Sequence, residues 1–124
     1  MSQGLTDGIA IIDDDALVRE ALKDCMESAG YSVQGFGSAE GFLASIPAQS
    51  AACLIVDVEL PGITGLELQA RLAESGNHAP IVFVTAHGSD VNRERALRQG
   101  AAGFLSKPVR RNELVNAVRV AIRR

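Results

Sequence analysis

The sequence predicts a doubly wound α/β domain on a five-stranded parallel sheet, with strand order 2-1-3-4-5 and helices on both faces. Two observations lead to this fold class. Short apolar runs alternate five times with segments whose apolar residues recur every three or four positions, the period of an amphipathic helix. In addition, 124 residues with 47% hydrophobic content suffice for one core, so we expect a single domain over residues 1–124.

The expected strands are the apolar runs of the chain. The first, third and fourth are unbroken runs typical of strands buried on both faces, whereas the second is weaker. Five successive β-α units require right-handed crossovers, and these place helices on both faces of a parallel sheet. We expect the strands at residues 8–12, 31–35, 52–56, 81–84 and 101–106.

The expected helices are bounded by capping and helix-breaking residues. We interpret Asp15 as the N-cap of the first helix in preference to a metal ligand. Ser38 caps a short second helix that ends at Ile46, because Pro47 cannot continue it, and Thr64 caps the third helix. The helices are expected at residues 15–29, 38–46, 64–74, 89–99 and 112–122.

Composition excludes several classes of function. The net charge of −3 has the wrong sign for a domain that binds nucleic acid by itself. Cys25 and Cys53 show no metal-binding or C-x-x-C spacing, so we expect core residues in a reducing cytoplasm. Residues 1–8 lack the features of a secretion signal, and no apolar run approaches the ~20 residues of a membrane span. We therefore expect a soluble, cytoplasmic protein without a membrane partner.

Polar side chains stand directly after four of the expected strands. Asp13 and Asp14 follow the first strand, Asp57 the third, Thr85 the fourth and Lys107 the fifth. Open α/β sheets bind ligands at the carboxyl ends of their strands, where the strand order switches, so the three carboxylates should flank one crevice. A shared divalent cation relieves their repulsion, and Mg²⁺ fits because it accepts carboxylate, water and phosphoryl oxygens.

Four motifs, taken in this order, resemble the receiver domains of two-component response regulators, also called CheY-like domains. The motifs are I-I-D-D-D at 11–15, L-I-V-D-V-E-L-P-G-I-T-G-L-E-L at 54–68, F-V-T-A-H-G at 83–88 and G-F-L-S-K-P at 103–108. The resemblance covers essentially the whole chain and implies the flavodoxin-like (βα)5 fold. The segments V-T-A-H-G and A-A-G-F-L-S-K-P are similar to receivers that precede LuxR-type helix-turn-helix output domains.

The resemblance implies that Asp57 is a phosphoacceptor. Asp14 would ligate Mg²⁺ directly, and Asp13 would act through water or by orienting the other ligands. The backbone carbonyl of Glu59 would be a further ligand of the ion. A carboxylate that attacks phosphorus needs its charge and the phosphoryl charge offset, which Mg²⁺ and a lysine supply by electrostatics.

The resemblance also implies a switch. Lys107 would pair with the phosphoryl oxygens, Thr85 would hydrogen-bond one of them after phosphorylation, and Phe104 would be the switch aromatic. The expected helix 89–99 has a thin apolar stripe, so it should pack loosely and shift. We expect the exposed surface to mediate homodimerisation on phosphorylation; it is made by residues 89–99, 101–106 and 112–122.

The implied partner is a sensor histidine kinase, and the implied output is control of transcription. DNA would be bound only through an output domain, so the chain is either a stand-alone receiver or, in our preferred interpretation, the N-terminal part of a longer regulator. We expect no turnover enzyme, although slow autodephosphorylation is compatible with this chemistry.

Two alternatives from other classes have to be weighed. A Mg²⁺-dependent phosphohydrolase of the haloacid-dehalogenase type also uses an aspartate nucleophile with Thr and Lys. Such enzymes carry D-x-D on the first strand and their acidic pair late, whereas here Asp13 and Asp14 come first and no cap segment is present. A pseudo-receiver, an interaction module that never takes phosphate, is disfavoured by the intact acidic pair together with Asp57, Thr85 and Lys107.

Overall fold

A computed structural model describes residues 8–45, 47–86 and 90–123 of the chain. Five strands lie in the order β2-β1-β3-β4-β5, and every neighbouring pair is parallel. The predicted sheet and its strand order are confirmed, with strand ends that differ from expectation by at most two residues. The strands are β1 (Gly8–Ile12), β2 (Ser32–Phe36), β3 (Cys53–Val56), β4 (Ile81–Thr85) and β5 (Gly103–Ser106).

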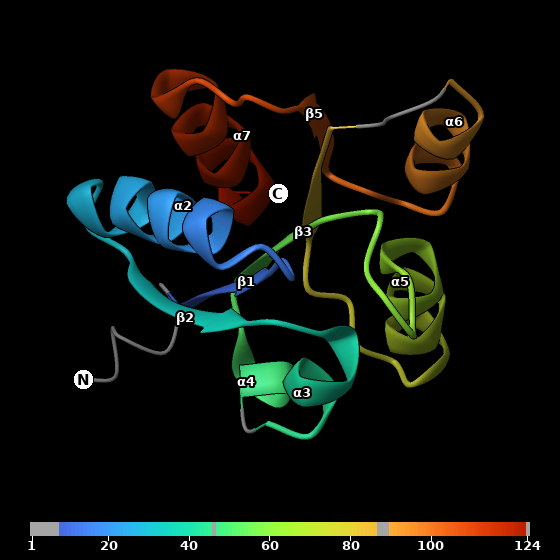
Figure 1. Cartoon of the computed structure of the whole chain (residues 1–124). Helices are drawn as coiled ribbons and strands as arrows, with labels where there is room; N and C mark the ends of the chain where they lie inside the picture. Colours follow the sequence, from blue (N-terminus) through green and yellow to red (C-terminus); the bar gives the residue numbers. More distant parts are fainter. Residues whose placement is uncertain (1–7, 46, 87–89, 124) are drawn as a thin grey trace.

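Helices cover both faces of this sheet, as predicted (Figure 1). One face is covered by α2 (Ala16–Ser28) and α7 (Arg111–Arg123). The opposite face is covered by α3 (Ala39–Leu43), α4 (Pro47–Ser50), α5 (Gly65–Glu74) and α6 (Asp90–Arg98). The expected start of α6 at Ser89 lies outside the described residues, as does His87 in the loop before it.

The strands divide the apolar core into two clusters, because successive side chains of a strand point to opposite faces. On β1, Ala10 and Ile12 belong to the cluster beneath α3, α4, α5 and α6. Ile9 and Ile11 belong to the cluster beneath α2 and α7. All four are at most 2% exposed, which explains why β1 is apolar without interruption.

The first and third predicted helix caps are confirmed. Asp15 accepts hydrogen bonds from Leu17 N at 3.0 Å and Val18 N at 3.3 Å, so its carboxylate is engaged as the N-cap of α2. Thr64 and Glu67 form a reciprocal capping box at the start of α5, in which each side chain accepts from the other residue's backbone N–H.

The helix expected at 38–46 is confirmed with its Ser38 cap but ends early, and a further short helix after it was not predicted. Ser38 caps α3 by accepting from Gly41 N at 3.0 Å, but α3 ends at Leu43 and a separate short helix, α4, starts at Pro47. Proline lacks an N–H and has a preset φ, which suits the first position of a helix as well as the end of one. The predicted end at Ile46 lies outside the described residues.

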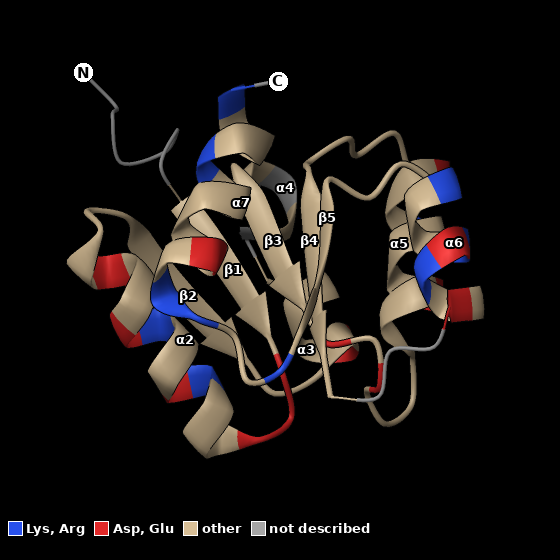
Figure 2. Cartoon of the chain, turned by 90° about the horizontal axis from the view of Figure 1, so that it is seen from above, with Lys and Arg blue, Asp and Glu red and all other residues tan. Residues whose placement is uncertain are grey.

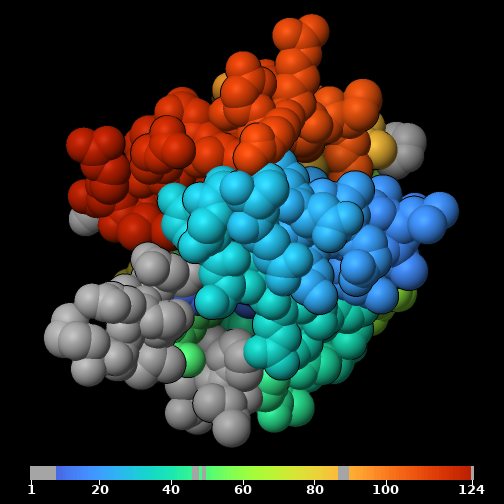
Figure 3. Space-filling view, turned by 90° about the vertical axis from the view of Figure 1, so that its left-hand side faces the viewer, coloured from blue at the N-terminus to red at the C-terminus, as the bar shows by residue number. Residues whose placement is uncertain are grey.

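Both cysteines are core residues, as expected. Cys53 is fully buried in β3, and burial raises the pKa of its thiol to about 12. Cys25 is half-buried on α2 near Arg111 of α7, and burial likewise raises its pKa. Figure 3 shows α2 in blue to cyan beside the red α7 on this face, and Arg111 Nη2 donates to Ser28 Oγ between them at 2.8 Å.

Within the described ranges, none of the helices combines the length and the apolar character that crossing a bilayer requires.

Gly65 brings the start of α5 against the end of β3. Its N–H donates to Val58 O at 2.9 Å, and a Cβ at this position would lie 2.4 Å from the carbonyl oxygen of Asp57. Such a contact is sterically forbidden, so only glycine allows α5 to begin this close to Asp57.

Replacing Gly65 by Ala should lower the free energy of unfolding by about 1–3 kcal/mol, the usual cost of an overpacked contact. The gain in helix propensity, at most about 1 kcal/mol, opposes this cost but does not cancel it. Urea unfolding followed by circular dichroism measures the difference. Gly103→Ala is the matched control, because a Cβ there meets its nearest neighbour at an ordinary 3.6 Å. Equal effects of the two substitutions would contradict the steric argument.

Candidate functional site

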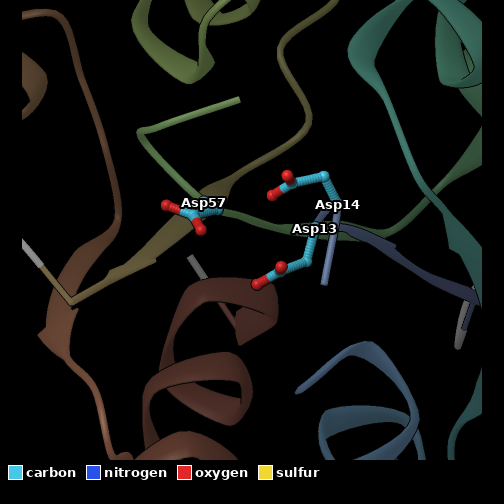
Figure 4. A group of neighbouring side chains, drawn as sticks. All are labelled: Asp13, Asp14 and Asp57. Atoms are coloured by element: carbon cyan, nitrogen blue, oxygen red, sulfur yellow. The ribbon is translucent and has the colours of Figure 1, made fainter. Parts of the chain in front are cut away.

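Three carboxylates meet at the carboxyl edge of the sheet, as predicted. Asp13 and Asp14 follow β1, Asp57 follows β3, and one oxygen of each lies within 4.8 Å of the others. Figure 4 shows the side chains converging from these two strand ends. Asp13 and Asp57 are buried, 1% and 8% exposed, while Asp14 is exposed at the rim. The site therefore has a buried floor and an accessible side.

Strand register places these residues at one level. Ile12 pairs with Val56 in the β1–β3 ladder, so the residues that follow them leave the sheet together. The ladder continues by one hydrogen bond from Asp57 N to Ile12 O at 3.0 Å, and Asp13 N donates to Phe36 O at 3.0 Å. The sheet itself thus holds the backbone of both buried aspartates.

Lys107, directly after β5, joins the two buried aspartates. Its Nζ donates to Asp13 Oδ2 at 2.7 Å and to Asp57 Oδ2 at 2.9 Å, and its side chain is 16% exposed. In Figure 2 the red segment after β1 and the blue segment after β5 lie next to each other at this edge. Burial by itself lowers the pKa of Lys107, but the hydrogen bonds and charges of the two aspartates outweigh it, so the pKa lies above its ordinary value.

Backbone N–H groups fix the remaining oxygens of the buried carboxylates. Asp13 Oδ1 accepts from Asp15 N at 2.9 Å, and Asp57 Oδ1 accepts from Glu59 N at 2.9 Å. Each carboxylate therefore has one oxygen held by its own turn and the other held by Lys107. This arrangement preorganises the buried carboxylates without a bound ligand.

Asp14 opens onto a groove formed mainly by the loop after Asp57. The groove is lined by Asp14, Val58, Glu59, Leu60, Pro61, Thr64, Leu66 and Asn92. The site is accessible from this side, because Asp14 and Glu59 are exposed.

Thr85 and Phe104, the two residues predicted to form a switch, lie on β4 and β5. Thr85 ends β4 with no exposed surface, and its carbonyl accepts from Lys107 N at 2.9 Å. Phe104 is half-buried on β5, and its ring lies 6.1 Å from that of Phe83 between centroids. Thr85 thus lies on β4, the neighbour of β3, and Phe104 lies one strand further out on β5.

The charge of the site suits a divalent cation. Three carboxylates face one ammonium group, so negative charge is in excess. Octahedral Mg²⁺ ligands, at about 2.1 Å from the ion, are at most about 4.2 Å apart. The oxygen separations, within 4.8 Å, need only a small inward movement of the exposed Asp14 to fit this geometry. The residues present therefore fit a hard cation.

Comparison with known proteins decides the family. The profile of the response regulator receiver domain matches residues 9–119. The chain belongs to this family. The four motifs therefore identified the receiver domain correctly, and response regulators are among its curated relatives.

Two curated relatives and two solved structures illustrate the match. TodT of Pseudomonas putida strain F1 is 41% identical over 115 residues, which are 93% of this chain and 51% of TodT. The transcriptional regulatory protein FixJ of Bradyrhizobium diazoefficiens is 37% identical over 93% of this chain and 56% of FixJ. Full-length FixJ from B. japonicum superimposes with a TM-score of 0.87 at 37% identity, covering 94% of this chain and 58% of that one. The response regulator StyR superimposes with a TM-score of 0.86 at 37% identity, covering 94% of this chain and 59% of the StyR chain.

This receiver domain spans about half the length of the curated relatives it matches. Its acidic triad and Lys107 come together as predicted, but two contributions to the site were missed from the sequence. The N–H groups of Asp15 and Glu59 hold the buried carboxylates. Arg19 of α2 donates from Nη1 to the carbonyl of Asp13 at 2.7 Å. From the sequence alone, an arginine in the first turn of a helix that bonds a backbone carbonyl cannot be distinguished from an arginine that is exposed to solvent.

Replacing Lys107 by Met in metal-free buffer should destabilise the receiver by about 3–5 kcal/mol, because two buried carboxylates lose their cation. The pKa of Lys107 is raised by folding, so its contribution is complete below the ordinary lysine value of 10.5 and is lost only as pH rises through the higher folded value. Urea unfolding at pH 7.5 and above pH 10.5 should therefore show a large and then a shrinking gap from wild type.

The matched control is Lys23→Met, which changes the only other lysine of the chain. It should have little effect at either pH. A Lys107→Met gap that stays constant into strong alkali would contradict the ion-pair account.

Proposed function

We propose that this receiver domain takes a phosphoryl group on Asp57 from a sensor histidine kinase and acts as a phosphorylation-dependent switch. The observation that carries the proposal is the position of Asp57. Its carboxylate lies beside two further acids and in contact with Lys107, at an edge that opens to solvent. Asp13 also contacts Lys107 and lies in the same cluster, but it is only 1% exposed against 8% for Asp57, so Asp57 is the more accessible of the two.

In the proposed reaction, a carboxylate oxygen of Asp57 attacks phosphorus, and the bond from phosphorus to the donor's leaving group breaks. Lys107 moves with the new phosphoryl oxygens and offsets their charge. Glu59 N, which donates to Asp57 Oδ1 at 2.9 Å, orients the carboxylate for attack by its other oxygen.

The metal ligands are proposed from the same geometry. Asp14 and Asp57 would hold Mg²⁺ directly, Asp13 through water or by orienting ligands, and the Glu59 carbonyl would complete the protein ligands. Bound Mg²⁺ would neutralise charge on the phosphoryl oxygens as they approach Asp57. Stoichiometric transfer fits a signalling protein, and we propose that the chain is not a turnover phosphohydrolase.

Incubation with Mg²⁺ and acetyl phosphate should add one phosphoryl group to the protein, detected by intact-mass spectrometry. Asp57→Asn should abolish the addition, because an amide cannot act as this nucleophile. Asp15→Asn is the matched control, since asparagine also caps helices and Asp15 caps α2 outside the triad. Undiminished labelling of Asp57→Asn would refute the assignment, and steady release of phosphate over many turnovers would favour the haloacid-dehalogenase alternative.

We propose that the switch acts through Thr85 and Phe104. A phosphoryl dianion on Asp57 offers Thr85 a charge-assisted hydrogen bond. Movement of the buried Thr85 hydroxyl toward it would open space into which the half-buried Phe104 ring can turn. Phe104 packs against the apolar cluster that contains Ala96 of α6, so the change would be transmitted to that helix.

The structure explains why α6 is the helix expected to move. Ala96 is its only buried residue, and the described part of α6 has a mainly polar surface. One buried side chain, Gln69 of α5, holds it by donating from Nε2 to Ala96 O at 3.0 Å, while Gln69 Oε1 has no partner in the described structure. An element that buries a single residue in the core can shift for a few kcal/mol, which one phosphoryl group can supply.

We propose that the shifted surface mediates homodimerisation. It consists of α6, β5 and α7, the segments predicted for this role, and α6 already exposes Val91 (72%) and Leu97 (43%). TodT is named a response regulator protein and FixJ a transcriptional regulatory protein. We therefore propose that the result is control of transcription through a DNA-binding output domain. The kinase, the output domain and a cytoplasmic location are parts of this proposal.

Light scattering of phosphorylated and unmodified protein should show a rise from monomer to dimer mass. Thr85→Ala should still be labelled by acetyl phosphate but should dimerise less, because the hydrogen bond to the phosphoryl group is lost. Thr64→Ala serves as a control threonine, since Thr64 caps α5 and lies outside the proposed relay. An unchanged mass on phosphorylation would remove dimerisation from the mechanism, and full dimerisation of Thr85→Ala would remove Thr85.

A further inference from the structure

Arg19 lies where α2, the turn after β1 and strand β2 meet. Its side chain is half-buried, and Nη1 donates to the carbonyl oxygen of Asp13 at 2.7 Å. This is a short, charge-assisted hydrogen bond from a guanidinium group to a backbone carbonyl. The contact joins α2 to the turn that carries Asp13 and Asp14.

Strand β2 leaves room for this side chain through its glycines. A Cβ on Gly35 would lie 3.2 Å from both Cγ and Cδ of Arg19, and one on Gly37 would lie 3.6 Å from Nη1. Gly35 has no positive φ, so its backbone does not itself require glycine. The absent Cβ at Gly35 therefore has one described function, which is to accommodate the stem of Arg19.

The bonded carbonyl belongs to the peptide unit that joins Asp13 to Asp14. Asp13 N is held by Phe36 O, and Asp13 Oδ1 is held by Asp15 N, so the Arg19 bond fixes the remaining polar group of Asp13. Asp14 is exposed, and no hydrogen bond to its carboxylate is found in the described ranges. The direction of the Asp14 side chain thus depends on the orientation of this peptide unit.

We propose that Arg19 is a positioning residue for the metal site, because it holds the Asp13–Asp14 peptide so that the Asp14 carboxylate faces Asp57. The inference rests on the proposed Mg²⁺ site. Two effects of Arg19 on a cation have opposite signs. Its positive charge repels the ion, whereas its hydrogen bond orients a ligand, and we assign the larger effect to orientation.

The test compares Mg²⁺ affinity by amide chemical shifts in NMR titrations, since the chain has no tryptophan for fluorescence. Arg19→Met keeps an apolar stem against Gly35 but removes the donor and the charge. It should weaken Mg²⁺ binding about tenfold or more, as loss of an outer partner of a ligand typically does. Arg71→Met, on the last turn of α5, is the control for loss of one positive charge and should bind like wild type.

A double-mutant cycle separates the Arg19 contact from a general effect on β2. Gly35→Ala should displace the Arg19 stem and weaken Mg²⁺ binding in the wild-type background. In Arg19→Ala, where no stem is present, Gly35→Ala should have almost no further effect. Additive losses would place the effect in β2 and overturn the inference.

Other outcomes are equally decisive. Binding by Arg19→Met that equals or exceeds wild type would show that charge outweighs orientation, and would overturn the proposal. If wild type itself binds no Mg²⁺, the proposed function fails, and the metal-free spectra then decide the inference. In those spectra the amide signals of Asp14 and Asp15 should move in Arg19→Met but stay in place in Arg71→Met; unchanged signals in Arg19→Met would refute the positioning role.

Discussion

The contact of one ammonium group with two buried carboxylates is the interaction on which the rest of the site depends. Lys107 joins the end of β5 to the ends of β1 and β3, across the end of β4. Asp13 and Asp57 lie side by side in an almost dry position, where their mutual repulsion is offset by that cation. With it, the site still carries more negative than positive charge, because Asp14 lies at the same place. Lys107 thus stabilises the two buried carboxylates, but the site keeps an excess of negative charge.

The surrounding structure keeps this arrangement rigid on one side and loose on the other. Backbone N–H groups, strand register and the close approach at Gly65 fix Asp57 and its neighbours. In contrast, α6 buries only Ala96 and is held at that point by Gln69. A change of charge at the rigid Asp57 site would therefore move α6, because the most weakly held element shifts first.

The sequence allowed the sheet, its order and the polar strand ends to be predicted, because these follow from apolar periodicity and from the topology of parallel sheets. It also allowed Asp15 to be separated from the acidic triad as a helix cap. The split between α3 and α4 was missed, because Pro47 is compatible with either end of a helix. Gly65 and Arg19 were missed for a different reason: their importance comes from distances to residues far along the chain or to backbone atoms, which no local pattern records.

The central claim, that the acidic site is completed by a divalent cation, is tested most directly by the dependence of wild-type stability on Mg²⁺. Urea unfolding of the unphosphorylated protein at constant ionic strength isolates ion binding from general screening. An ion that binds only the folded state should raise the free energy of unfolding by about 1.4 kcal/mol for each tenfold increase above its dissociation constant. We expect that rise for wild type and its loss in Asp14→Asn. A free energy of unfolding that is indifferent to Mg²⁺ would contradict the account.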